Sequence, residues 1–145
     1  MPQWVVDKIT DALNRRGKPL KGAKILILGI AYKKNVDDMR ESPSVDLMAL
    51  LQAKGMEFSY LDPFIPRFPR LRKYSFDLES TPLTEENLAK ADCVVIAIDH
   101  DQFDYRMIQQ HAPLVVDTRG VYDNRDDNLV VRFINLLHPQ YIAIC

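Results

Sequence analysis

Residues 24–44 restrict the possible folds more than any other part of this 145-residue chain. Positions 25–28 are an uninterrupted run of Ile and Leu, which predicts a strand covered on both faces. Cationic residues follow where that strand should end: Lys33, Lys34 and Arg40. Ser42 and Pro43 are typical of a helix N-cap and a first helical residue. Because a strand end beside a helix N-terminus favours anions, this segment could hold a phosphate without a glycine-rich loop.

Composition places the chain among ordinary globular domains, with 47% hydrophobic and 27% charged residues. The net charge of −1 gives no general attraction to nucleic acid or to a membrane surface, so neither is expected as a partner. No apolar run approaches the roughly 20 residues of a membrane span, and the N-terminus lacks signal-peptide features. Two cysteines make neither a disulfide framework nor a zinc site. A cytoplasmic location is therefore expected.

Short apolar segments alternate with segments of helical periodicity along most of the chain. The predicted strands are 24–29, 57–61, 93–98 and 114–116, and the predicted helices are 2–16, 43–55, 84–88 and 101–111. Residues 62–80 are predicted as a surface excursion, and two apolar segments, 129–137 and 141–144, follow a polar loop. This order favours a parallel sheet with helices on both faces. The helix at 2–16 should expose an apolar face for a neighbouring segment or a second copy.

Ligands of parallel sheets bind beyond the carboxyl ends of the strands. The polar residues expected at that edge are Tyr32, Lys33, Asp62, Asp99, His100, Asp117 and Arg119. Lys33 could place an ammonium on a phosphate or carboxylate, or it could be a solvated loop lysine. Arg119 could make a forked contact to an oxyanion, or it could pair with Asp117 or Asp123.

Several other chemistries are not expected from the residues present. The dinucleotide fingerprint G-x-G-x-x-G is missing, because only Gly29 stands after the first strand, so NAD binding by this domain is not expected. The acidic pair Asp37 and Asp38 is not joined by further ligands at metal spacing. Cys93 reads as an inert core thiol, and His100 as an acid, a base or a polar turn residue. No nucleophile, base and orienting group come together, so no catalytic residue is assigned.

With these motifs in view, the chain resembles the C-terminal UDP-binding domain of the UDP-glucose/GDP-mannose dehydrogenase family. The resemblance is carried by residues 29–43, GIAYKKNVDDMRESP, where a strand and a glycine precede an aromatic-Lys pair, an acidic loop and Arg-Glu-Ser. The segments 60–63 (YLDP), 99–103 (DHDQF) and 116–120 (VDTRG) follow in the expected order. Residues 1–22 resemble the tail of the central dimerisation helix and its connector, and residues 23–145 the UDP-binding domain.

The resemblance implies a Rossmann-like three-layer sandwich with a mostly parallel sheet, preceded by an N-terminal helix. It also implies that Tyr32 and Lys33 contact the nucleotide and that Arg119 contacts the sugar nucleotide or its phosphates. The parent enzyme would oxidise the sugar C6 hydroxyl to a carboxylate with NAD. Its NAD domain, central domain and catalytic cysteine would lie outside this segment. The segment would then bind the UDP moiety of a UDP-sugar without turnover of its own, and the parent would be a homodimer.

A different class remains open from the residues alone. A receiver-like α/β signalling or interaction module would use Asp37 and Asp38 to bind Mg²⁺ near a phosphorylated aspartate, for which Asp99 is the candidate. The acidic pair lies eight or more residues beyond the first strand, which is far for a site at that strand's end. A purely structural domain is a third alternative.

Overall fold

A computed structural model describes residues 2–31, 35, 42–69, 76–119, 121, 129–137 and 140–144. The helices are α1 (Pro2–Arg15), α2 (Pro43–Ala53), α3 (Glu85–Lys90) and α4 (Tyr105–His111). The strands are β1 (Lys24–Leu28), β2 (Glu57–Leu61), β3 (Cys93–Ile96), β4 (Val115–Asp117), β5 (Leu129–Leu137) and β6 (Gln140–Ile144).

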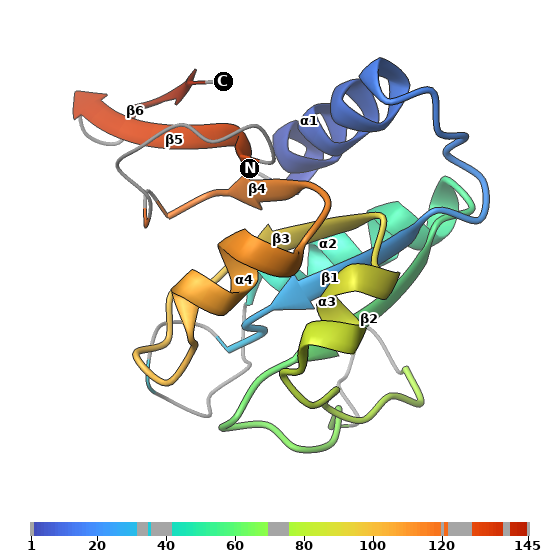
Figure 1. The fold of residues 1–145 in the computed structure, drawn as a ribbon, viewed down its shortest axis with the longest axis vertical. Helices are drawn as coiled ribbons and strands as arrows, with labels where there is room; N and C mark the ends of the chain where they lie inside the picture. The colour runs from blue at the N-terminus through green and yellow to red at the C-terminus, as the bar shows by residue number, and fades with distance from the viewer. Residues whose placement is uncertain are drawn as a thin grey trace.

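These strands form one sheet in the order β2-β1-β3-β4-β5-β6. The pairs from β2 to β5 are parallel, and β6 returns antiparallel to β5 as a hairpin that continues the sheet beyond β4 (Figure 1). The chain leaves β1 towards β2 on one side and comes back to β3 on the other. The switch point of this doubly wound sheet, where such folds bind ligands, therefore lies between the carboxyl ends of β1 and β3.

The strands β1, β3 and β4 are buried on both faces because helices cover both. In β1, Ile25 and Ile27 belong to the core shared with α1 and α2, while Leu26 and Leu28 belong to the core shared with α3 and α4. This assignment follows from the two-residue period of a strand. Figure 1 shows α3 and α4 on one side of the sheet and α2 on the other. The predicted three-layer, mostly parallel α/β architecture with an N-terminal helix is confirmed.

The expectation that α1 exposes its apolar face is wrong. Val6, Ile9 and Leu13 are fully buried and join the core beneath α2. The reason is the width of the sheet. One helix cannot cover four strands, so α1 packs beside α2 and also contacts β4, closing the part of this face that α2 leaves open.

The boundaries of the other elements differ from the predictions by a few residues. The last helix before β4 begins after Asp104, whose carboxylate accepts a hydrogen bond from the Met107 amide, and not after Asp101. The strand predicted at 93–98 ends at Ile96, and the two apolar segments near the C-terminus are β5 and β6. In the region predicted as a surface excursion, Phe68 is buried among aromatic rings, so part of that segment completes the core.

Within the described ranges, no helix has the length and hydrophobicity needed to cross a bilayer. The sheet and its helices place polar residues at the carboxyl edge, where the candidate site lies.

The turn after β1 yields the first prediction. Gly29 has a φ of +86°, and a Cβ built there would lie 2.6 Å from the Ile98 Cβ and 2.8 Å from the Ile98 carbonyl oxygen. Gly29→Ala should lower the free energy of unfolding by about 3 kcal/mol, through backbone strain and a clash with main chain. Urea denaturation measures the loss.

Gly17→Ala is the matched control, since Gly17 also has a positive φ, +68°, but a Cβ there would meet nothing within 4 Å. Its loss should be about 1 kcal/mol, from backbone strain alone. Equal losses in the two variants would show that the approach of Ile98 is unimportant.

Candidate functional site

The start of α2 is fastened directly to the exit of β1. The Ser42 hydroxyl donates to the Ile30 carbonyl oxygen at 2.7 Å and accepts from the Ser44 amide at 3.2 Å. The Ser44 hydroxyl donates to the Gly29 carbonyl oxygen at 3.1 Å. Ser42 is therefore the N-cap that the sequence predicted, and Pro43 is the first helical residue. A helix N-terminus thus lies beside the carboxyl end of β1, an arrangement that favours anions.

Asp62 follows β2 and is completely buried. One carboxylate oxygen, Oδ2, accepts from the amides of Ile30 and Ala31 at 2.9 and 3.2 Å, and Oδ1 accepts from the Phe64 amide at 2.9 Å. Burial alone would raise the pKa of Asp62. The hydrogen bonds from His100 and from main-chain amides outweigh it, so the pKa is lowered from the ordinary value of 3.8. Asp62 is a buried carboxylate that ties the ends of β1 and β2 together.

His100 follows β3 and is also completely buried. Its Nε2 lies 2.9 Å from Asp62 Oδ2, and its Nδ1 accepts a hydrogen bond from the Asn35 amide at 2.7 Å. An imidazole nitrogen that accepts carries no proton, so the ring is neutral and its proton is on Nε2, from which it is donated to Asp62. The rings of Phe64 and Phe103 lie 4.9 and 5.5 Å away between centroids and fix the plane of the imidazole.

Asn35 stands in the left-handed region with a φ of 62°, where asparagine is tolerated better than most residues. Its side chain donates to Asp101 Oδ2 at 2.8 Å and accepts from the Asp101 amide at 3.1 Å. Three hydrogen bonds therefore join this residue of the loop after β1 to the segment after β3.

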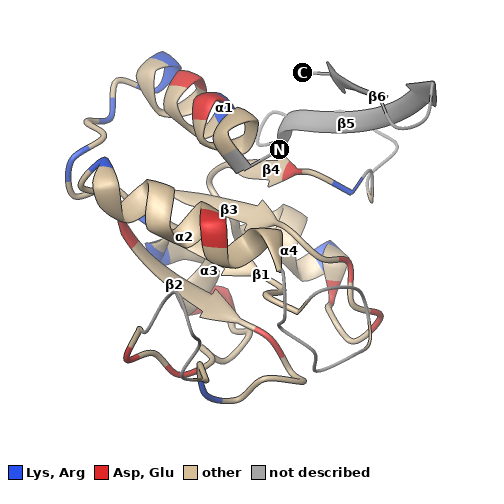
Figure 2. Cartoon of the chain, turned by 180° about the vertical axis from the view of Figure 1, so that it is seen from behind, with Lys and Arg blue, Asp and Glu red and all other residues tan. Residues whose placement is uncertain are grey.

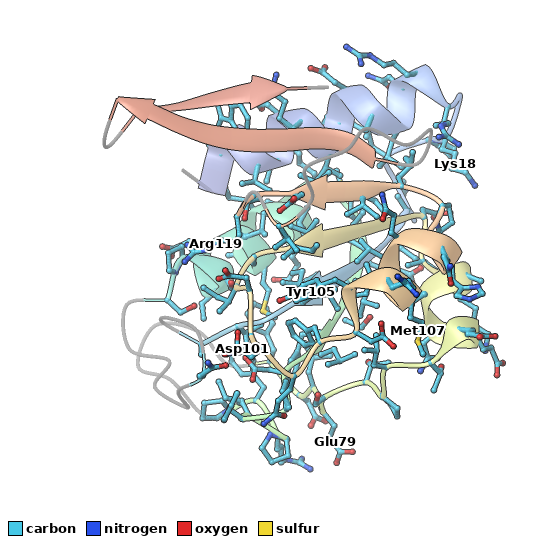
Figure 3. All side chains as sticks on the ribbon, turned by 60° about the vertical axis from the view of Figure 1, so that its left-hand side comes forward. Lys18, Glu79, Asp101, Tyr105, Met107 and Arg119 are labelled. Atoms are coloured by element: carbon cyan, nitrogen blue, oxygen red, sulfur yellow. The ribbon has the colours of Figure 1, made fainter. Side chains whose placement is uncertain are left out.

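Arg119 lies just beyond β4 at the same edge, as predicted (Figure 3). Its Nε donates to Asp99 Oδ1 at 3.2 Å, and the Arg119 side chain is 41% exposed. Asp117, one of the two carboxylates considered as its partner, accepts instead from the Arg119 main-chain amide at 3.1 Å. A guanidinium carries five N–H donors, so this contact leaves it the capacity to bind an oxyanion.

The basic connector between α1 and β1 lies away from this edge. Figure 2 shows Lys and Arg residues along the connector between α1 and β1, at the amino ends of the strands. There Lys18 pairs with Asp92 at 3.2 Å. The basic connector is therefore not part of the candidate site.

Two predicted site residues, Tyr32 and Lys33, lie outside the described residues, as do Asp37, Asp38 and Arg40. Their roles stay predictions. Among the residues that the structure does describe, no group of three His, Cys, Asp or Glu side chains could hold a metal ion.

The remaining candidates are accounted for by structure. Burial and the neighbouring Asp92 raise the pKa of Cys93 to about 12, so this thiol is inert, as predicted. The space that a side chain at position 29 would need is filled by Ile98. Gly29 therefore allows the close packing of the turn after β1 against Ile98.

The buried Asp62–His100 pair was missed by reasoning from sequence, although both residues were placed at this edge. The two are 38 positions apart and no local pattern joins them. The sequence offered one weak signal. Each of the two residues follows an apolar strand, and parallel strands bring their carboxyl ends to the same edge of the sheet.

Comparison with known proteins assigns the class. The model of the UDP-glucose/GDP-mannose dehydrogenase family, UDP binding domain, matches residues 26–124, and the chain belongs to this family. It is 34% identical over 129 residues to UDP-N-acetyl-D-mannosamine dehydrogenase of Escherichia coli, covering 83% of this chain and 30% of that protein. It is 30% identical over 126 residues to NDP-N-acetyl-D-galactosaminuronic acid dehydrogenase of Ralstonia solanacearum, covering 83% of this chain and 27% of that protein.

Solved structures agree on the fold. UDP-D-ManNAc dehydrogenase from Pyrococcus horikoshii superposes with a TM-score of 0.69 at 21% identity, covering 89% of this chain and 29% of that one. NDP-N-acetyl-D-galactosaminuronic acid dehydrogenase from Methanosarcina mazei superposes with a TM-score of 0.67 at 26% identity, covering 84% of this chain and 26% of that one. The chain thus spans less than a third of the length of these relatives. Membership of this family disfavours the receiver-like alternative.

Asp62 yields the second prediction. Because its folded-state pKa is lowered, its carboxylate stabilises the fold above pH 3.8, and this contribution is lost as the pH falls through the folded-state value. Asp62→Asn should cost about 3 kcal/mol at neutral pH, since an amide nitrogen would face buried N–H donors. The difference in free energy of unfolding between the wild type and Asp62→Asn should therefore become smaller in acid.

Chemical denaturation at a series of pH values measures that gap. Asp11→Asn, at an exposed position on α1, should follow the wild type at every pH. A gap for Asp62→Asn that stays constant down to the acid transition would contradict the assignment of Asp62 as a paired, ionised carboxylate.

Proposed function

We propose that this chain is the nucleotide-binding part of an NAD-dependent UDP-sugar 6-dehydrogenase and that it binds the UDP moiety at the carboxyl edge of its sheet. The observation that supports this most directly is that the N-terminus of α2 is bonded to the exit of β1 at this edge, where the partly exposed side chain of Arg119 also lies, beyond β4. Positive ends of backbone dipoles and a guanidinium together suit a diphosphate.

In this proposal Tyr32 and Lys33 contact the nucleotide and Arg119 contacts the phosphates or the sugar. The chain's contribution to the reaction is to hold the nucleotide so that the sugar reaches chemistry located in other parts of the enzyme. Holding reactants in the right geometry lowers the entropic part of the barrier, which is a large term in enzymatic catalysis. The domain would therefore act through binding and orientation.

The rest of the reaction follows from the family as a proposal. Converting the C6 hydroxymethyl group to a carboxylate removes four electrons and consumes water, so two NAD molecules would accept two hydrides. The NAD site, the central domain and the catalytic groups would belong to the portion of the relatives that this chain does not span, and residues 1–22 would be the end of the central helix. The parent would be a cytoplasmic homodimer.

The substrate class is proposed from the relatives' names, which specify N-acetylhexosamine derivatives of nucleoside diphosphates. We infer a UDP-N-acetylhexosamine in preference to UDP-glucose or GDP-mannose.

The third prediction concerns binding. UDP should bind this chain weakly, and Lys33→Ala and Arg119→Ala should each reduce the affinity at least tenfold, since a charged hydrogen bond to phosphate contributes about 1.5–3 kcal/mol. Isothermal titration calorimetry measures the loss.

Lys54→Ala is the control, because Lys54 is exposed at the far end of α2 and carries the same charge. If Lys33→Ala binds UDP with the same affinity as Lys54→Ala, Lys33 is not part of the binding site.

The fourth prediction concerns turnover. The 145-residue chain mixed with NAD and UDP-N-acetylhexosamines should produce no NADH, because the residues proposed for catalysis lie elsewhere. NADH absorbance measures this, with a full-length family enzyme as the positive control. Steady NADH production by the purified chain would show that the catalytic groups are present here.

A further inference from the structure

The buried Asp62–His100 pair contacts the chain after β1 at two places that the structure describes. At its start, Asp62 accepts the amides of Ile30 and Ala31, and at Asn35, His100 accepts the main-chain amide. Tyr32 and Lys33 lie between these points in the sequence. The two acceptors are joined to each other by the 2.9 Å contact between His100 Nε2 and Asp62 Oδ2.

We propose that His100 is a positioning residue, whose Nδ1 holds the Asn35 main-chain amide and thereby supports UDP binding by the residues near Asn35 in the sequence, Tyr32 and Lys33. The inference rests on the proposed function, because it assigns the loop's role to UDP binding. It adds a residue that contacts no nucleotide and acts through the backbone of the loop.

A neutral imidazole is suited to this task because one of its nitrogens donates a hydrogen bond while the other accepts one. Nε2 donates to Asp62, and Nδ1 accepts from Asn35, so one neutral ring links a carboxylate on one side to an N–H on the other. An apolar side chain of similar size could fill the space between Phe64 and Phe103. It would leave the Asn35 amide and one Asp62 lone pair without their partner.

The surrounding contacts show that the position of the ring is fixed. The Tyr105 hydroxyl donates to the His100 carbonyl oxygen at 2.6 Å, which anchors the backbone of this residue to α4. The Asp101 side chain and amide hold the Asn35 side chain, so the loop residue is bound by both neighbours in the segment after β3. The left-handed φ of Asn35 directs its amide at the ring, a conformation that these bonds stabilise.

Two substitutions separate the roles of the two nitrogens. In His100→Gln the side-chain amide nitrogen reaches about the place of Nε2, so the bond to Asp62 can form while the acceptor for Asn35 is lost. In His100→Asn the side-chain oxygen lies about where Nδ1 was, so Asn35 keeps an acceptor while Asp62 loses its donor. A buried core variant in α3, Leu88→Val, is the control for loss of stability alone.

The experiment measures UDP affinity by calorimetry and amide hydrogen exchange by NMR for all four proteins without ligand. His100→Gln should weaken UDP binding by about tenfold, the value of one lost hydrogen bond that orders the site. Its Asn35 amide should exchange faster than in the wild type. His100→Asn should bind within about threefold of the wild type, and Leu88→Val should bind as the wild type does.

The outcomes separate the inference from the proposed function. If wild type and variants bind UDP equally while the Asn35 amide still exchanges faster in His100→Gln, the loop is held but has no part in binding, and the inference fails. If the Asn35 amide is unaffected by His100→Gln, the inference fails at its first step. If the wild type does not bind UDP, the proposed function itself fails, whatever the exchange rates show.

Discussion

The candidate site depends on one buried carboxylate. Asp62 has no exposure, and an ionised group in such a place is tolerated when its oxygens are fully hydrogen-bonded. Here the donors come from the exits of three parallel strands: Ile30 and Ala31 after β1, Phe64 after β2 and His100 after β3. All of these donors bind the same carboxylate. If one strand exit moved, the buried charge would lose a hydrogen-bond donor, which is costly. The charge therefore defines how the strands end.

The topology makes such a fastening necessary. Apolar side chains of β1, β3 and β4 fill both faces of the sheet, and the polar residues of the candidate site follow the strand ends. At the switch point the chain after β1 leads to a helix on one face and the chain after β3 to a helix on the other (Figure 1). The α2 N-cap and the Asp62–His100 pair join these exits by hydrogen bonds. Gly29 allows the close approach to Ile98 that brings these two exits together.

Local features of the fold could be predicted from sequence, and distant pairings could not. The strand at Ile25–Leu28 and the cap at Ser42 depend on residue types within one turn or one strand, so both were correct. The start of α4 was placed three residues early because Asp101 and Asp104 are both good caps, and the choice between them rests on Asp101 binding Asn35. The burial of α1 depends on how much of the sheet α2 leaves uncovered. A local sequence pattern does not predict that area.

The site itself was predictable only as a set of positions. Parallel strands bring Asp62, His100 and Arg119 to one edge, and the sequence was sufficient for that. It could not show that Arg119 pairs with Asp99 through its side chain, or that a histidine and a carboxylate 38 positions apart are hydrogen-bonded to each other. These facts depend on rotamers and on backbone positions set by the whole sheet.

The two side-chain contacts at this edge, Arg119 with Asp99 and Asp62 with His100, differ in a way that suits binding. Arg119 and Asp99 are partly exposed, and an exposed pair is worth little, about 0–1 kcal/mol, because water screens both charges. Arg119 can therefore exchange Asp99 for a phosphate at small cost. The contact of Asp62 with His100 is fully buried, and opening it would leave a buried carboxylate without its side-chain donor. The contact at Arg119 is thus exchangeable and the contact at Asp62 is fixed, which is compatible with the proposed binding of a phosphate at Arg119.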